Sequence, residues 1–161
     1  MGHVITGLVA APPLLADMAR RHRLHSPALL AQGLAFLPLR DIDLDAFLSP
    51  PLDGTPEGFS SLSAPLIDHL LTLSLKGPVA YVETDYFAGT GSQGAAVFRD
   101  GHLAMQPVTA HTGPINLALA FLGVKARHEQ EDEFEAVGLN RFRHTEEWIA
   151  ATGEQPEIPE P

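Results

Sequence analysis

A chain of 161 residues has the length of one domain, and its 45% hydrophobic content can form a core without disulfides or metals. The formal net charge of −10 argues against nucleic-acid binding, which depends on lysine and arginine contacts to phosphates. The absence of cysteine excludes thiol chemistry. No apolar run approaches the roughly 18 residues of a membrane span, and the apolar N-terminal stretch lacks the basic region of a signal peptide. We therefore expect a cytoplasmic protein that binds neither nucleic acid nor membrane.

The first third of the chain predicts two strands and two helices. The run His3–Ala10 is β-branched and apolar, which indicates a buried strand, and the two prolines after it start a helix. Residues 28–39 predict one further strand, and Asp41 is placed to cap a short helix. Residues 49–61 are rich in Pro, Gly and Ser, as expected for a surface loop. A largely buried helix follows, with Ser63 at its start.

Strand signals, turn signals and polar side chains coincide only in residues 78–110. The alternation of side chains along a strand places Glu83 and Asp85 on one face and Tyr86 on the other. Residues 88–93 then predict a loop, and Asp100-Gly101 predicts a type I′ hairpin turn between the next two strands. The result is a three-stranded antiparallel meander.

The segment from Gly89 to Gly94 matches G-x-G-x-x-G, but a strand follows it where a dinucleotide fold requires a helix. We therefore expect a hairpin loop in which Gly89 or Gly91 supplies positive φ, and no bound nucleotide. Gly94 and the alanines after it leave little bulk on the middle strand, so a helix or a large aromatic such as Trp148 should pack close to it.

The last third of the chain predicts two helices and an acidic surface. Gly113-Pro114 opens an apolar helix that Gly123 ends, and Thr145 caps a final helix anchored by Trp148. Residues 153–161 have almost nothing to bury and are predicted to form a disordered tail. Half of the twenty acidic residues follow Arg127, which serves solubility or steers a basic partner toward the protein.

Two groups of charged residues are candidates for chemistry. Glu83 and Asp85 have three possible roles: a paired acid and base, two ligands of one divalent cation, or two carboxylates on a solvated sheet face. In one interpretation a structural ion cluster joins two arginines to three acids: Arg141, Arg143, Asp132, Glu133 and Glu135. In the other, Arg141 binds an anionic group or the carboxylate of a partner. No catalytic constellation is assembled in the sequence, so we expect no cofactor and no metal site, and we favour a protein that is not an enzyme.

The stretches ETDYFAGTGSQGAAVFRDG and DEFEAVGLNRFRHTEEW resemble a group of small uncharacterised bacterial proteins with the patterns E-x-x-YFGG-x-G-x-Q and DEF-x-x-x-GL-x-x-R followed by a late Trp. The resemblance covers the chain up to about residue 149. The matching positions are Glu83, Tyr86, Phe87, Gly89, Gly91, Gln93, Asp132, Glu133, Phe134, Gly138, Leu139, Arg141 and Trp148. Ala88 stands where the pattern has a glycine. The resemblance implies an association with immunity proteins of bacterial toxin systems.

These observations predict a single α+β domain over residues 1–152, with a mostly antiparallel or mixed sheet of about five strands and helices packed on one face. The leading interpretation of function is a non-enzymatic acidic protein that neutralises a basic toxin. The alternative is an enzyme or small-ligand protein that uses a polar pocket formed by Glu83, Asp85, Tyr86, Gln93 and Arg141. A homo-oligomer associating through a sheet edge is a third interpretation.

Overall fold

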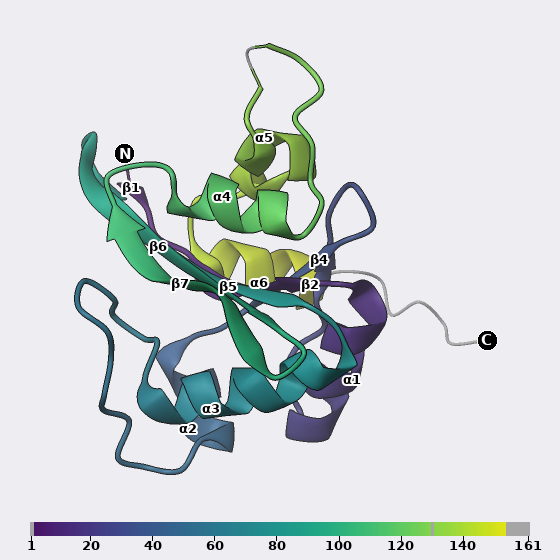
Figure 1. Ribbon diagram of the computed structural model, residues 1–161, viewed down its shortest axis with the longest axis vertical. Helices are drawn as coiled ribbons and strands as arrows, with labels where there is room; N and C mark the ends of the chain where they lie inside the picture. The colour runs from purple at the N-terminus through teal and green to yellow at the C-terminus, as the bar shows by residue number, and fades with distance from the viewer. Residues whose placement is uncertain (1, 130, 154–161) are drawn as a thin grey trace.

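The protein folds as one α+β domain, seen in a computed structural model that describes residues 2–129 and 131–153. The strands are β1 (Gly2–His3), β2 (Thr6–Ala10), β3 (Ala28–Leu29), β4 (Ala35–Pro38), β5 (Val79–Phe87), β6 (Thr90–Arg99) and β7 (His102–Ala110). The helices are α1 (Pro12–His22), α2 (Asp41–Phe47), α3 (Ala64–Leu73), α4 (Pro114–Phe121), α5 (Glu133–Val137) and α6 (Thr145–Gly153), with short 3₁₀ turns at Ser74–Lys76 and Leu139–Arg141. Figure 1 shows the sheet lying between two groups of helices.

The seven strands form one sheet in the order β3-β4-β2-β5-β6-β7, and β1 pairs with the far end of β5. Every strand pair is antiparallel among the residues that the structure describes. The expected number of about five strands was too low, partly because residues 28–39 form a hairpin of β3 and β4. Gln32 and Gly33 turn the chain there with φ of 59° and 77°. The apolar residues around them conceal this turn in the sequence.

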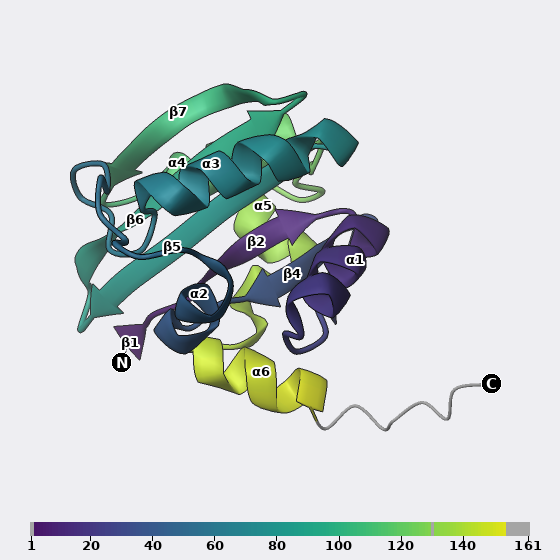
Figure 2. The same ribbon diagram turned by 90° about the horizontal axis from the view of Figure 1, so that it is seen from below.

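Helices cover both faces of the sheet, which corrects the expectation of one covered face. Leu8 pairs with Leu37 and with Tyr81, and these side chains join the cluster packed under α1, α2 and α3. Val9, the next residue, belongs to the cluster under α4, α5 and α6. Because strand side chains alternate between faces, both sides of the central strands are apolar and need a cover. We call the two sides the α1–α3 face and the α4–α6 face (Figures 1 and 2).

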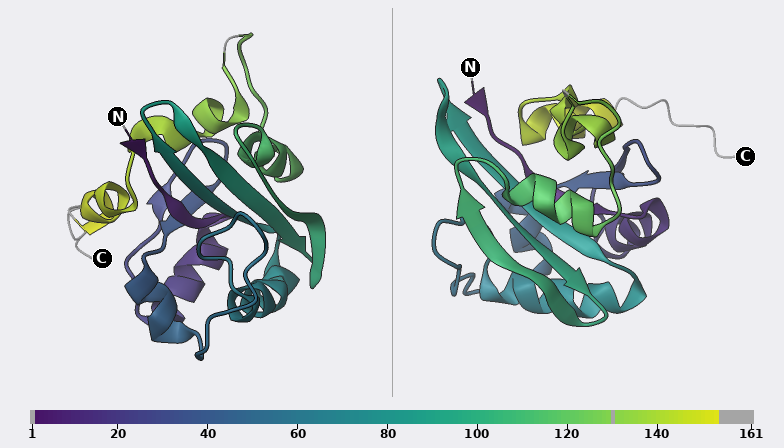
Figure 3. Two further views of the ribbon diagram at one scale, coloured as in Figure 1. Left: turned by 90° about the vertical axis from the view of Figure 1, so that its left-hand side faces the viewer. Right: turned by 45° about the horizontal axis from the view of Figure 1, so that its top comes forward.

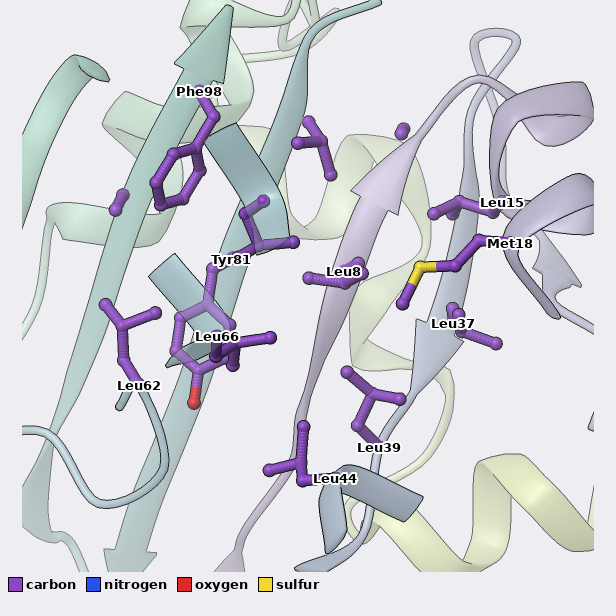
Figure 4. Packing of buried hydrophobic residues seen from close by; sticks show 14 of the residues in the cluster. Leu8, Leu15, Met18, Leu37, Leu39, Leu44, Leu62, Leu66, Tyr81 and Phe98 are labelled. Carbon is purple, nitrogen blue, oxygen red and sulfur yellow. The ribbon is translucent and has the colours of Figure 1, made fainter. Parts of the chain in front are cut away.

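The core on the α1–α3 face is built from leucines of the strands and helices. Figure 4 shows Leu8, Leu37, Tyr81 and Phe98 of the sheet beside Leu15, Met18, Leu44 and Leu66 of the helices. On the opposite face Trp148 is fully buried, with its ring 5.1 Å from that of Phe36 and 4.9 Å from that of Phe142. Trp148 therefore anchors α6 to β4.

The neighbour of Gly94 is Phe59, from the long loop between α2 and α3. A Cβ at Gly94 would lie 2.7 Å from the Phe59 ring and 2.9 Å from the Thr109 methyl group. A glycine is needed here because the aromatic ring rests directly on the β6 backbone. The expectation of a close neighbour was right, but its identity could not be read from the sequence.

The N-terminal and C-terminal segments are joined by backbone hydrogen bonds. Val4 N–H donates to Arg143 O at 2.7 Å, and Thr145 N–H donates to Val4 O at 3.0 Å. The Thr145 hydroxyl accepts from Thr6 N–H at 3.1 Å, so this side chain ties α6 to β2. The Glu147 carboxylate accepts from the N–H groups of Arg143 and His144 ahead of α6, the role expected for Thr145. Gly153, the first residue of the predicted tail, is the last residue of α6. The rest of that tail, residues 154–161, lies outside the described residues.

Within the described ranges, none of the helices combines the length and apolarity needed to cross a membrane.

Candidate functional site

The hairpin of β5 and β6 turns at Ala88-Gly89, with φ of 53° and 81°. Two residues at positive φ are the requirement of a type I′ turn. The chain is already in β6 at Thr90, so the loop expected over residues 88–93 is a two-residue turn followed by a strand. This register places Thr84 opposite Gln93 and Tyr86 opposite Gly91. A Cβ at Gly91 would lie 2.0 Å from Asp85 O, which explains the glycine.

On the α1–α3 face, Glu83 holds the long loop against the sheet. Its carboxylate accepts from Ser60 N–H at 2.8 Å, from Ser61 N–H at 3.3 Å and from the Tyr81 hydroxyl at 2.6 Å. Burial, and after it the Glu83 carboxylate, raises the pKa of Tyr81 well above its usual range. Tyr81 therefore stays protonated, and its hydroxyl donates a hydrogen bond to Glu83. With only 7% of its surface exposed and its oxygens occupied, Glu83 has a structural role.

The structure separates three more of the predicted residues from one another. Asp85 points to the same face as Glu83 and is exposed to solvent. Arg141 lies with its guanidinium carbon 5.5 Å from the centre of the Trp148 ring, a cation–π contact. Glu133 begins α5. Among the described residues, Arg141 forms no ion pair with Asp132 or Glu133, so the expected ion cluster is not formed. Gly138 ends α5 in the left-handed region, at φ 96°.

On the α4–α6 face, the same hairpin borders a cavity of about 460 Å³. Tyr86, Gln93 and Asp132, three of the residues singled out in the sequence, line it together with Phe134 and Gly89. The remaining wall comes from β1, from β5, from the segment between β7 and α4, and from the start of α4: His3, Thr84, His111, Thr112, Gly113, Ile115 and Asn116. Figure 3 shows the segment that leads from β7 into α4 beside the ends of β5 and β6. Four separate stretches of chain thus meet around one space.

A chain of hydrogen bonds fixes the sheet side of this cavity. Ile115 N–H donates to Gln93 Oε1 at 2.8 Å, and Gln93 Nε2 donates to the Tyr86 hydroxyl at 3.1 Å. The Tyr86 hydroxyl donates to His111 O. The Tyr86 and His111 rings also meet edge to face, with centres 5.7 Å apart. Gln93 therefore sets the position of α4 relative to the sheet, because it satisfies an N–H group at the start of that helix.

A second set of bonds joins α4 to α5. Asn116 Nδ2 donates to Asp132 Oδ2 at 3.2 Å, and Asn116 Oδ1 accepts from Phe134 N–H at 2.9 Å. Asp132 Oδ1 accepts from Glu135 N–H at 2.9 Å, and the Glu135 carboxylate accepts from Asp132 N–H at 3.4 Å. This reciprocal capping box starts α5. The D-x-x-E spacing that signals it is visible in the sequence, but this signal was not used and the helix was missed.

His3 closes the cavity from β1. Its Nδ1 lies 2.7 Å from the Thr84 hydroxyl, and its ring meets that of Phe134 with centres 5.5 Å apart. Burial, and after it the positive charge of Arg143, lowers the pKa of His3, so the ring is neutral at neutral pH. Its Nε2 is shielded from solvent and has no hydrogen-bond partner within the described part of the chain.

A larger hollow of about 710 Å³ lies between α1, the β3–β4 turn and the 3₁₀ turn after α3. Its charged side chains already pair with one another: Asp17 binds Arg21 at 3.0 Å and Lys76 at 3.5 Å. The cavity beside Tyr86 is the better candidate because hydrogen bonds between separate segments of the chain fix the polar groups of its wall.

Comparison of the chain with protein families, with curated proteins and with solved structures gave no match. The resemblance drawn from the sequence patterns therefore stays a prediction.

Sequence reasoning missed His3, Thr84, His111, Thr112 and Asn116 as cavity residues. One of them, Thr84, could have been found by counting outward from a two-residue turn at Ala88-Gly89, because that register places it beside Gln93 on the face of Tyr86. The others come from segments whose meeting depends on the tertiary fold.

Proposed function

We propose that this protein binds a small molecule in the cavity between the β5–β6 hairpin and the starts of α4 and α5. The observation that carries the proposal is the convergence of Tyr86, Gln93 and Asp132 on one space of about 460 Å³. Pockets that hold small ligands measure roughly 300–1,000 Å³ and combine apolar walls with a few fixed polar groups. Tyr86 and Gln93 are held by bonds to each other and to the backbone, which favours binding over turnover.

Replacement of a wall residue tests the proposal. Thr112 is exposed, lines the cavity and makes no side-chain hydrogen bond within the described residues, so Thr112→Phe adds bulk without removing a bond. A compound library screened by thermal shift should give ligands that stabilise the native protein and lose this effect in Thr112→Phe. Thr90→Phe is the control, because Thr90 is exposed on the same hairpin but outside the cavity. If every stabilising compound acts equally on both variants, the cavity is not the binding site.

We also propose a second function, which a different observation supports. In this proposal the chain is an acidic immunity-type protein of the cytoplasm that masks a basic toxin. Acidic residues crowd the segment that leads into α5 and its first turn, beside the cavity: Glu129, Glu131, Asp132, Glu133 and Glu135. An acidic surface accelerates encounter with a basic partner, and salt weakens that effect.

Pull-down with the product of a neighbouring gene tests this second function. Retention at low salt should fall in the double variant Glu129→Lys with Glu133→Lys. It should persist in Glu57→Lys, which changes an exposed charge in the loop on the α1–α3 face. Absence of any retained partner at low salt would contradict it.

A further inference from the structure

The hydrogen-bond donors around the cavity are already used by the fold. Ile115 N–H is bound by Gln93 Oε1 and Phe134 N–H is bound by Asn116 Oδ1, so side-chain oxygens occupy the helix-start groups that an anion would need. Gln93 Nε2 and Asn116 Nδ2 each donate to a neighbour within the wall. An anionic ligand would have to displace these internal acceptors.

The two histidines in the cavity wall are bound to the fold through Nδ1. His111 Nδ1 lies 3.0 Å from Gly91 O, and a carbonyl oxygen only accepts, so this nitrogen donates its hydrogen within the wall. His3 Nδ1 lies 2.7 Å from the Thr84 hydroxyl, and His3 Nε2 is shielded from solvent. Neither contact leaves a donor directed at an anion in the cavity.

The charge and the aromatic surface of the wall favour a cation. Asp132 is the one carboxylate among the described lining residues, its side chain is exposed, and no lysine or arginine lines the cavity there. Tyr86 and Phe134 contribute aromatic rings, whose faces attract cations. Nowhere in the described ranges do three His, Asp or Glu side chains gather closely enough to hold a metal ion, so this single carboxylate suits an organic cation better.

We propose that the cavity selects a small organic cation, a protonated amine or guanidinium on an apolar body. The charged N–H donors face the Asp132 carboxylate, and the apolar body lies against Phe134 and Tyr86. This inference rests on the proposed small-molecule function and adds the chemical class of the ligand.

Three probes of one shape and different charge test it on the native protein. Calorimetric titration at neutral pH compares phenethylamine, 2-phenylethanol and phenylacetate, which are a cation, a neutral molecule and an anion. We expect the amine to bind at least tenfold more tightly than the alcohol, with phenylacetate the weakest. Equal or tighter binding of the alcohol or of phenylacetate would overturn the inference.

A matched pair of variants assigns the charge effect to the cavity. Asp132→Asn removes the carboxylate and keeps a side chain suited to the N-cap of α5. It should weaken the amine about tenfold, equivalent to about 1.4 kcal/mol, and leave the alcohol unchanged. Glu133→Gln changes the net charge equally at the next residue, which does not line the cavity, and should have little effect. Equal weakening in both variants would show a general field effect and would overturn the inference.

The two proposals fail in different ways. If neutral or anionic compounds bind and lose binding in Thr112→Phe, while the amine does not bind, the small-molecule function stands and the cation preference is wrong. If no compound is sensitive to Thr112→Phe, the small-molecule function itself is wrong.

Discussion

The two faces of the β5–β6 hairpin carry similar polar residues but use them differently. On the α1–α3 face, the Glu83 carboxylate is buried and its oxygens are filled by Ser60, Ser61 and Tyr81. On the α4–α6 face, the polar groups hold one another around a cavity, and the Asp132 carboxylate in its wall is exposed. A carboxylate buried under a loop stabilises the fold, whereas an exposed carboxylate beside an open space can also meet a ligand. The difference lies in what covers each face and not in residue type.

The largest effect that tests this comparison is expected from Glu83→Ala. The substitution leaves the buried Tyr81 hydroxyl without an acceptor and releases the loop at Ser60, so the free energy of unfolding should fall by about 2–4 kcal/mol. Asp85→Ala, two residues along on the same face and exposed, should change it by less than about 0.5 kcal/mol. Urea denaturation measures both values. Similar losses in the two variants would remove the structural role given to Glu83.

A smaller effect is expected on the other face from Gln93→Ala. The variant loses the acceptor for Ile115 N–H and the donor to Tyr86, which should lower the free energy of unfolding by about 1–2 kcal/mol. The amide resonance of Ile115 should shift and exchange faster with solvent. Gln106→Ala, at an exposed position of β7, is the control. An unchanged Ile115 amide would show that Gln93 does not position α4.

Acidification should destabilise the protein from both faces. Burial, and after it the charge of Arg143, lowers the pKa of His3. Burial, and after it the nearby His22, lowers the pKa of His69. The unfolded chain, with a histidine pKa near 6.5, then binds more protons than the native state, so acid favours unfolding. The stabilisation is complete above pH 6.5 and is lost as the pH falls through the lower native values.

Urea denaturation between pH 5 and pH 7.5 measures this loss. His69→Leu should flatten the pH dependence, because the ring packs between Phe47 and His22 and leucine fills that site without titrating. His102→Gln, at the exposed β6–β7 turn, is the control. Stability that rises on acidification would contradict the prediction.

The smallest effect is expected at the turn that the two faces share. Ala88 has φ of 53°, a left-handed conformation that costs a residue with a Cβ roughly 1 kcal/mol. Ala88→Gly should therefore raise the free energy of unfolding by about 0.5–1 kcal/mol, a gain visible as a higher midpoint in urea. Ala88→Val should lower it. A loss of stability in the glycine variant would mean that the alanine side chain contributes more than the strain removes.

The sequence predicted several features that depend on neighbouring residues. The Asp100-Gly101 turn has φ of 53° and 80° as expected, and Ser63 caps α3 by accepting from Leu66 N–H. The side on which a helix packs was not predictable, because an apolar stripe indicates burial without specifying which face of the sheet it covers. The turn at Gln32 was missed because it lies in an apolar run.

The candidate site was predictable only in part for the same reason. Alternation already places Glu83 and Tyr86 on opposite faces, so a pocket containing both conflicted with the strand pattern itself. The place of Gln93 in the cavity wall depended on the length of the β5–β6 turn. The place of Asp132 depended on the packing of α5 near β1. Those contacts join residues far apart in the chain, and no local pattern encodes them.

The bonds between Val4 and the segment Arg143–Thr145 have a consequence for biosynthesis. β2 pairs with β4 on one side and with β5 on the other, and Val4, two residues before it, is bridged only when the segment that starts the last helix has been made. During translation β4 follows β2 by about 30 residues, β5 follows by about 70, and the partners of Val4 follow by about 140, at roughly 5–20 residues per second. One side of the apolar strand β2 therefore stays unpaired for several seconds, and Val4 waits longer still.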